Sequence, residues 1–359
     1  MAITHPAQDR YSALVLAKLR ASLVLQDGIV FNNDYEGNPV AGKVRIPVRD
    51  TEVAVGDYDV ATGLAIGQGA TSYLDVLINK QKAVNELIDG YEAAAVPDGL
   101  IAERLDSAGY ALARQLDSDG ATELLAAGTV TNVSLITAAN AYSHFVDIRT
   151  LLSKANVPPI GRYALVTPDF LGLLLKSPEF IKASDLGDAV VQTGAIGKIA
   201  GFSVFEFNDN TPNLRCICGH PGWSTRVKEW SVPIAINNLG NQFIGASAVQ
   251  GRLVYGHKLT KPLTVRIIYS PGELEASLAQ GSDTGKTKVV CTAPTGTAKY
   301  RKNPATRVVF DQSDSGFTAI STEFSPSVGD IVEVVDFVSS KAASVCYLTV
   351  TADVIKPAA

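Results

Sequence analysis

Apolar and polar residues alternate in two segments near the N-terminus, at 43–49 and 72–79. Alternation with a period of two is typical of half-buried strands, so the two segments predict a long two-stranded finger. Pro47 cannot donate a ladder hydrogen bond, which predicts an edge or a bulge. Because a lone hairpin is at best marginally stable in water, we expect the finger to lie on another surface. Its apolar face comprises Val44, Ile46, Val48, Leu74, Val76 and Ile78.

Charged residues divide the finger into a basic base and an acidic tip. Lys43, Arg45 and Arg49 alternate with the apolar residues, and Asp57 and Asp59 lie in the glycine-rich tip. The basic stripe has two interpretations. It is either a solvated strand face or a contact with the acidic tip of an adjacent copy, which would favour head-to-tail self-association.

Apolar spacings of three and four residues predict helices between 80 and 155. The first occupies the segment before the breaker at 97–99, the second runs from 100 to 127, and the third spans 137–155. At ~1.5 Å per residue the second helix is long enough to act as a spine. The first helix rests on the spacing of Val84, Leu87, Ile88 and Tyr91.

Strand and helix signals alternate after the third helix. Residues 163–166 form a short apolar run, and Thr167 followed by Pro168 is a helix start. A glycine-bearing loop follows at 194–201, with Gly194, Gly197 and Gly201. Further strands are expected at 202–207, 214–218, 223–227 and 248–258.

The two ends of the chain differ from this α/β pattern. Residues 1–35 are expected to form an arm with one short helix over 9–25. Residues 273–285 are polar and glycine-bearing, which predicts a linker. Alternating segments separated by turn residues then predict an all-β module over 286–359, either a sandwich or a barrel.

Composition narrows the class of protein. Hydrophobic residues make up 46% of the 359 residues, charged residues make up 19%, and the net charge is −5. Since soluble chains average about 25% charged residues, we expect unusually much surface to be buried against partners. The charge excludes an overall basic nucleic-acid binder. Neither a secretory signal nor a membrane-length apolar run is present, and four cysteines indicate a reducing compartment.

Candidate catalytic and metal motifs each have a simpler explanation. Gly285-Lys286-Thr287 lacks the glycine that a phosphate-binding loop needs five residues earlier, where Gln280 stands. Cys216, Cys218 and His220 lie at alternate positions of a strand, but zinc needs four ligands and no second cluster follows. We find no hydrolase or dinucleotide-binding motif. The sequence therefore predicts no enzyme, no metal and no cofactor.

Two stretches, 163–170 and 194–204, resemble the axial-domain region of tailed-phage major capsid proteins, and 251–258 resembles their last strands. The order of arm, hairpin, spine helix and α/β region is also similar. The resemblance implies an α+β chain with the Hong Kong 97-type capsid fold over residues 1–272. Its parts would be an N-arm (1–35), an extended loop (40–79), a peripheral domain (80–128 and 248–271) and an axial domain (135–245). The C-terminal module resembles the Ig-like additions of some phage capsid proteins.

The resemblance implies a major capsid protein of a bacteriophage virion that self-assembles, through pentamers and hexamers, into an icosahedral capsid in the host cytoplasm. A separate scaffolding protein, a portal and non-specifically packaged double-stranded DNA are the implied partners, and no membrane is involved. The extended loop would contact neighbouring subunits, and the glycines of the 194–201 loop would belong to the axial domain.

Two other classes of protein stay open at this stage. A bacterial encapsulin-like nanocompartment shares the shell fold and encloses a cargo enzyme. A soluble α/β enzyme with a β accessory domain is a second alternative, which would be a monomer or small oligomer with polar residues clustered in a pocket.

Overall fold

The computed structural model describes residues 23–35, 42–49, 53, 55–64, 71–90, 100–177, 197–239, 244–292 and 294–357. They divide into two compact units. The first lies within residues 1–126 and 221–260, and the second within 127–220 and 261–359. The predicted arm helix over 9–25 falls mostly outside the described residues.

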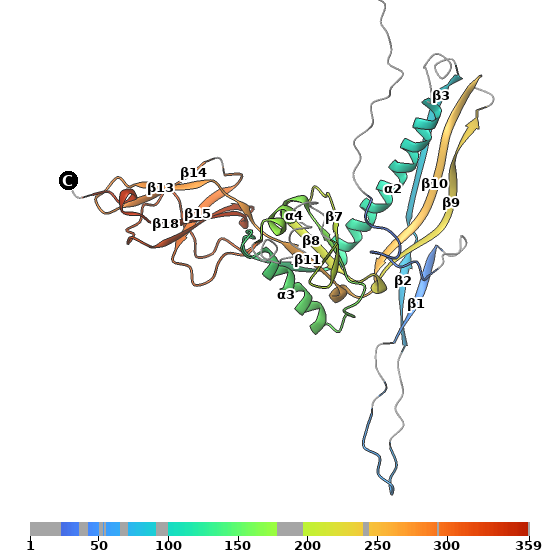
Figure 1. Ribbon diagram of the computed structural model, residues 1–359, viewed down its shortest axis with the longest axis horizontal. Coiled ribbons are helices and arrows are strands. Elements are labelled where there is room, and N and C mark those ends of the chain that lie inside the picture. The colour runs from blue at the N-terminus through green and yellow to red at the C-terminus, as the bar shows by residue number, and fades with distance from the viewer. Residues whose placement is uncertain are drawn as a thin grey trace, which may run out of the picture. The chain divides into compact units, whose positions relative to one another are not determined.

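The first unit combines one long helix, α2, with two small antiparallel sheets (Figure 1). Strands β1 and β2 form the predicted finger, and β3, β10 and β9 form a three-stranded sheet beside α2. A cluster of Ile88, Ala108 and Val249 joins this sheet to the helix. The elements are β1 (Lys43–Arg49), β2 (Thr71–Leu77), β3 (Lys80–Asp89), α2 (Leu100–Ala127), β9 (Ser224–Asn238) and β10 (Ala246–Leu259), with a short 3-10 turn at Pro221–Trp223.

Strand β3 replaces the first predicted helix, so that prediction is wrong. Val84 and Ile88 are four residues apart, which puts them on one side of a helix and equally on one side of a strand. Leu87, which only the helix would place on that side, is 52% exposed. Pairing with β10 selected the strand, and sequence spacing carries no information about that distant partner.

The second unit begins with a six-stranded sheet in the order β4-β11-β8-β5-β7-β6, packed against α3 and α4. Phe145 of α3 contacts Phe170 of α4 and Phe202 of β7 in its core. Helix α4 begins at Pro168 after Thr167, as predicted. The elements are β4 (Thr129–Asn132), α3 (Ala141–Lys154), β5 (Tyr163–Val166), α4 (Pro168–Leu175), β6 (Lys198–Ile199), β7 (Phe202–Glu206), β8 (Leu214–Gly219) and β11 (Val265–Tyr269), with a 3-10 turn at Pro262–Thr264.

Two strands lie in a different sheet from the one expected for them. Strand β9 falls within the expected axial segment 135–245 but pairs with β10 in the three-stranded sheet. Strand β11 falls within the expected peripheral segment 248–271 but pairs with β4 and β8 in the six-stranded sheet. Both strands have apolar residues at alternating positions. This pattern predicts a strand but does not specify which sheet the strand joins.

The C-terminal residues of the second unit form an all-β module. A five-stranded sheet, β12-β18-β17-β15-β16, is covered on one face by the β13–β14 hairpin through Val289, Tyr300 and Val334. The strands are β12 (Gly272–Glu273), β13 (Ala276–Gln280), β14 (Thr287–Cys291), β15 (Thr297–Lys302), β16 (Thr318–Ala319), β17 (Ile331–Val338) and β18 (Lys341–Thr349), with a 3-10 turn at Ala352–Val354.

The predicted linker at 273–285 is largely part of this module. Strand β12 pairs in parallel with β18, and β13 pairs with β14. Its alternating small and apolar side chains, among them Ala276 and Leu278, pack into the module core. The surrounding glycine and serine residues make this short alternation resemble a linker.

The module also packs directly on the six-stranded part of the second unit. Leu135 lies in one buried cluster with Val335, Phe337 and Val345 of the module. The Tyr269 ring stacks on Phe310 at a centroid distance of 5.4 Å, and the Phe310 amide donates to the Val133 carbonyl at 3.1 Å. The module is therefore continuous with the unit that precedes it.

A two-residue loop, Ala200-Gly201, joins β6 to β7, and both residues have positive φ angles (+47° and +86°). Such a turn favours Asn-Gly, because a β-carbon is strained at left-handed angles. We expect Ala200→Asn to stabilise the protein by about 0.5 kcal/mol and Ala200→Val to destabilise it by about 1–2 kcal/mol. Urea unfolding would measure both, and equal midpoints for the two variants would contradict the assignment.

Candidate functional site

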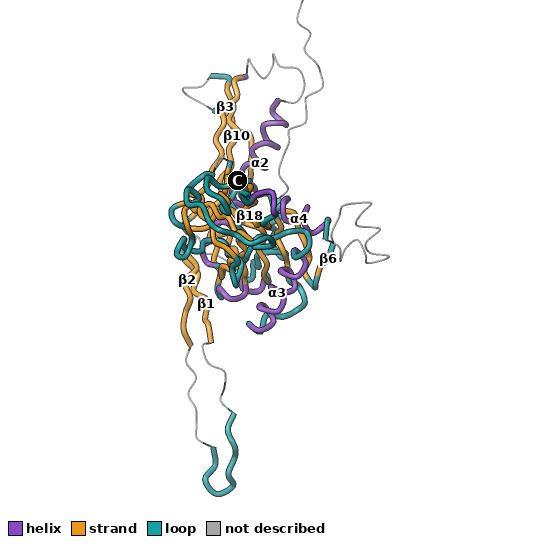
Figure 2. Tube along the Cα trace, turned by 90° about the vertical axis from the view of Figure 1, so that its left-hand side faces the viewer, coloured by secondary structure: helices purple, strands orange, loops and turns teal. Residues whose placement is uncertain are grey.

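The finger is the most prominent candidate surface, and its strands pair in the predicted way. Lys43 lies opposite Leu77 and Arg49 lies opposite Thr71 in an unbroken antiparallel register. Residues 55–64 form a loop at the far end of the pair (Figure 2).

The finger's apolar face is covered at its base by its own chain. Ile46, Val76 and Ile78 form a buried cluster with Val227 of β9 and Val254 of β10. The expectation that this face needs a surface to lie on is therefore satisfied within the subunit. Val44 packs at the edge of the cluster, while Leu74, further toward the tip, is half-buried.

The basic stripe has a partner inside the finger as well. Lys43 Nζ lies 2.9 Å and Arg45 Nε 3.0 Å from the carboxylate of Asp75 on β2. The hydrogen bond from Lys43, helped by both positive charges, lowers the pKa of Asp75. Two of the three basic residues thus have a cross-strand acidic neighbour, and the side chain of Arg49 lies outside the described residues.

The tip exposes apolar side chains as well as its two acidic ones. The Asp59 carboxylate accepts hydrogen bonds from the amides of Ala61 and Thr62, so it shapes the turn. Asp57 is exposed beside it. Val55 is 97% and Val60 is 91% exposed. The exposed large apolar side chains of this region are Val53, Val55, Tyr58, Val60 and Leu64. Sequence reasoning concentrated on the charges and missed this apolar set, although valine and tyrosine in a glycine-rich loop were the available signal.

Residues 25–32, which we call the arm root, form a second organised region of the first unit. Leu25, Val30 and Phe31 have no exposed surface. The Asn32 amide donates to the Ser224 carbonyl at 2.8 Å, and the Arg226 amide donates back to the Asn32 carbonyl at 3.0 Å. The arm root is therefore docked at the beginning of β9.

Arg226 lies at the centre of that contact with a side chain that is only 2% exposed. Its Nη1 lies 3.0 Å from Asp27 of the arm root, and its Nη2 lies 3.8 Å from Asp117 of α2. Its Nε donates to His257 Nε2 at 2.9 Å. Burial lowers the pKa of Arg226 and raises that of Asp117. The sequence offered no motif for this cluster, because its members lie far apart in the chain.

The half-buried His257 predicts a loss of stability in acid. Burial, with Arg226 adding to it, lowers the pKa of His257 to about 3. Between pH 6.5 and 3 the unfolded chain therefore binds a proton that the folded chain does not, and stability falls as the pH falls. The free energy of unfolding falls by up to about 4 kcal/mol. Asp117 partly offsets this loss, because its raised pKa lets the folded chain bind a proton more readily than the unfolded chain does.

Urea unfolding at pH 7 and pH 4 would measure this effect. His257→Gln keeps an acceptor for Arg226 but cannot titrate, so we expect a shallower pH dependence than in the parent protein. Equal pH dependence in both proteins would contradict the assignment to His257.

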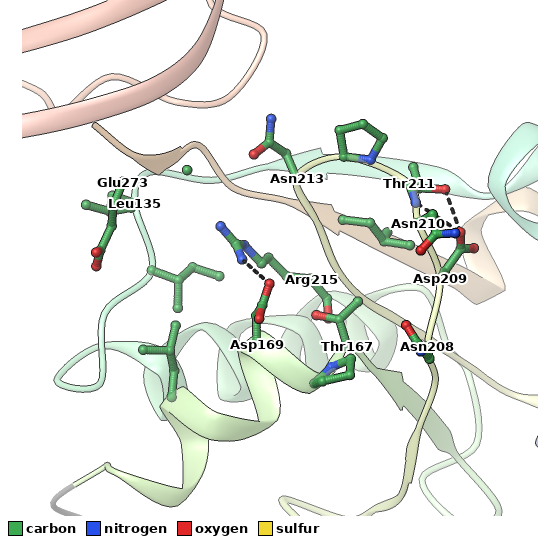
Figure 3. Close-up of a pocket in the computed structure, with 16 residues that line it drawn as sticks. Leu135, Thr167, Asp169, Asn208, Asp209, Asn210, Thr211, Asn213, Arg215 and Glu273 are labelled. Carbon is green, nitrogen blue, oxygen red and sulfur yellow. Dashed lines mark hydrogen bonds and ion pairs between the residues drawn. The ribbon is translucent and has the colours of Figure 1, made fainter. Parts of the chain in front are cut away.

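The second unit contains a cavity of about 750 Å³ between α4, the 208–213 loop and β12 (Figure 3). Arg215 lies along its wall, 4.0 Å from the exposed carboxylate of Asp169, and donates to the Pro271 carbonyl. Asp209 accepts from the amide and hydroxyl of Thr211. No histidine or cysteine is among the residues that line this cavity.

The remaining sequence candidates are structural where they are described. Cys216 and Cys218 are fully buried with their sulfurs 3.7 Å apart, and burial raises the pKa of Cys216. No group of three potential metal ligands occurs in the described part of the chain. Gly197 precedes β6 and Gly201 completes its turn, whereas Gly194 lies outside the described residues. Among the described helices, none is long and apolar enough to cross a membrane.

The comparisons with known proteins point to one architecture. A family model described as "Phage capsid protein" matches residues 90–214. A structure from Mycobacterium phage Che8 is similar with a TM-score of 0.64 at 24% identity, covering 74% of this chain and 98% of that chain. The chain has the fold of a phage capsid protein. It is the α+β, Hong Kong 97-type architecture expected from the sequence.

Other capsid structures support the same fold. The capsid structure of the cyanophage P-SCSP1u has a TM-score of 0.62 at 14% identity, covering 73% of this chain and 92% of that one. The mature capsid of bacteriophage PhiM1 is similar with a TM-score of 0.58 at 14% identity. The match covers 74% of this chain and 92% of that chain. No curated protein sequence is matched. In each structural match about a quarter of this chain has no counterpart.

Proposed function

We propose that this chain is the major capsid protein of a tailed phage and that many copies build the icosahedral head shell around double-stranded DNA. The observation that carries the proposal is the fold, which extends over 92% of the matched chains in the P-SCSP1u and PhiM1 capsids. The family match over 90–214 supports it. The role would be structural rather than enzymatic, as the capsid fold of the chain suggests.

Assembly would use the finger and the axial part of the second unit. The six-stranded region would form pentamers and hexamers, and the finger tip would contact a neighbouring subunit through Val55, Tyr58 and Val60. Exposed apolar side chains in such a group are typical of an interaction surface. Many modest contacts made together give a stable shell through their high effective concentration.

The proposal extends to location and partners. The protein would reside in the virion capsid after assembly in the host cytoplasm, with a separate scaffolding protein and a portal. With a net charge of −5, the subunit would enclose DNA without sequence-specific contacts. The C-terminal module, for which the Ig-like assignment stays a prediction, would supply the segment that the matched capsids lack.

Size-exclusion chromatography of the recombinant full-length chain, with negative-stain electron microscopy of the leading fraction, tests the proposal. We expect shells, or five- and six-membered rings that close into shells when scaffold is added. An inert monomer at high concentration, with candidate scaffold present, would overturn it. Shells that co-purify with an enclosed enzyme would instead indicate a nanocompartment.

A further inference from the structure

Gly120 lies inside the long helix α2, where glycine is an unfavourable residue. A β-carbon built on Gly120 would lie 2.9 Å from Cε2 of Phe31 and 3.3 Å from Nη2 of Arg226. The Phe31 ring has no exposed surface, so it has little room to move away. The absent side chain at this position is therefore what admits the arm root to the surface of α2.

Phe31 joins Gly120 to the buried cation. The guanidinium carbon of Arg226 lies 4.6 Å from the centre of the Phe31 ring, and His257 contacts the same ring at 5.0 Å. The arm root adds two contacts of its own, from Asp27 to Arg226 and from the Leu25 amide to Asp117 of α2. The Phe31 ring and the Arg226 guanidinium thus both pack against the glycine of the helix, and they contact each other.

The polar part of this contact is poorly suited to stabilising the fold. Nη2 of Arg226 and Nδ1 of His257 are buried, and neither has a hydrogen-bond partner among the described residues. Buried charges with incomplete hydrogen bonding often cost as much free energy as their attraction returns. Such groups contribute more clearly to selecting one geometry, because only one position of the partner satisfies them.

We propose that Gly120, Phe31 and Arg226 form a lock that fixes the arm root on α2, and that the lock orients the N-terminal arm for shell assembly. The second half of this inference rests on the proposed capsid function, whereas the first half concerns the subunit alone. Gly120 and Arg226 act here as positioning residues, since the contact with a neighbouring subunit would be made elsewhere.

Gly120→Ala tests the lock, with Gly109→Ala as the matched control. Both glycines lie in α2, but a β-carbon at Gly109 would meet only Cδ1 of Ile234 at an ordinary 3.8 Å. In the unassembled full-length chain we expect Gly120→Ala to speed chymotrypsin cleavage after Phe31 roughly tenfold, because cleavage follows the population of the open form. Hydrogen exchange at the Asn32 and Arg226 amides should accelerate in parallel, and Gly109→Ala should change neither.

A double-mutant cycle keeps the proposal testable if Gly120→Ala folds poorly. In the parent protein we expect Gly120→Ala to destabilise the chain. In the Phe31→Ala background the obstructing ring is gone and only Nη2 of Arg226 stays within 3.3 Å of the new β-carbon, so the same change should cost clearly less stability. An equal change of unfolding free energy in both backgrounds would overturn the lock.

The two halves of the inference have separate outcomes. Unchanged cleavage and exchange in Gly120→Ala would overturn the lock whatever the protein assembles into. Faster cleavage with a normal yield of shells by electron microscopy would overturn the role in assembly alone. If the parent chain itself forms no shells, the proposed capsid function fails, while the cleavage and exchange results still decide the lock.

Discussion

Replacing residues 50–70 with Asn-Gly is expected to leave a folded subunit that no longer forms shells. Arg49 and Thr71 lie opposite each other, so a two-residue turn can close the finger without changing its register. The buried cluster of Ile46, Val76 and Val254 at the base stays intact. The change removes the exposed residues 55–64, and with them the surface that we propose to contact the next subunit.

Electron microscopy and size-exclusion chromatography would measure the loss of shells, and circular dichroism would establish that the subunit still folds. A second variant, Val55→Ser with Tyr58→Ser and Val60→Ser, keeps the length of the finger and removes its apolar side chains. We expect it to lower the yield of shells by more than tenfold, because three apolar contacts of about 1 kcal/mol or more are lost per subunit. Normal shells from the shortened protein would refute the proposed role of the tip.

Leu135→Asp is expected to destabilise the second unit by roughly 3 kcal/mol or more. Leu135 is buried against Val335, Phe337 and Val345 of the C-terminal module. A carboxylate there would have to be ionised in an apolar cluster or take up a proton, and either costs free energy. The large effect is expected because the module is packed on this unit and is not merely tethered to it.

Val328→Asp is the control for that prediction. Val328 also belongs to the module but is 65% exposed, so a charge there remains in water and should change stability by less than about 0.5 kcal/mol. Urea unfolding followed by circular dichroism would compare the two variants, because both tryptophans, Trp223 and Trp230, lie in the first unit. Equal unfolding midpoints would mean that the contact of Leu135 with the module contributes nothing.

Several elements were predicted correctly because their determinants are local. Each of these signals involves residues that are only a few positions apart in the sequence. They are the alternation in β1 and β2, the Thr167-Pro168 start of α4 and the apolar spacing of α2. A strand or helix that buries one face must carry its apolar side chains with the corresponding period. Those patterns can therefore be read without knowledge of the partner surface.

The errors concern elements whose state depends on a distant partner. Val84 and Ile88 fit a helix and a strand equally, and pairing with β10 decided between them. Part of the expected linker is a strand, because it pairs with β14 and because Ala276 and Leu278 pack against the core of the module. By contrast, the expectation that the apolar face of the finger lies on another surface is met at its base, by Val227 and Val254 of the same chain.

Local pattern, composition and resemblance were enough to predict the α+β class, the finger, the spine helix and the capsid fold. The tertiary structure alone brought Phe31, Gly120 and Arg226 together, and it alone showed that the C-terminal module is packed against Leu135. The reason is physical. Periodicity is set by the geometry of one element, whereas a buried contact depends on which distant segments exclude water together.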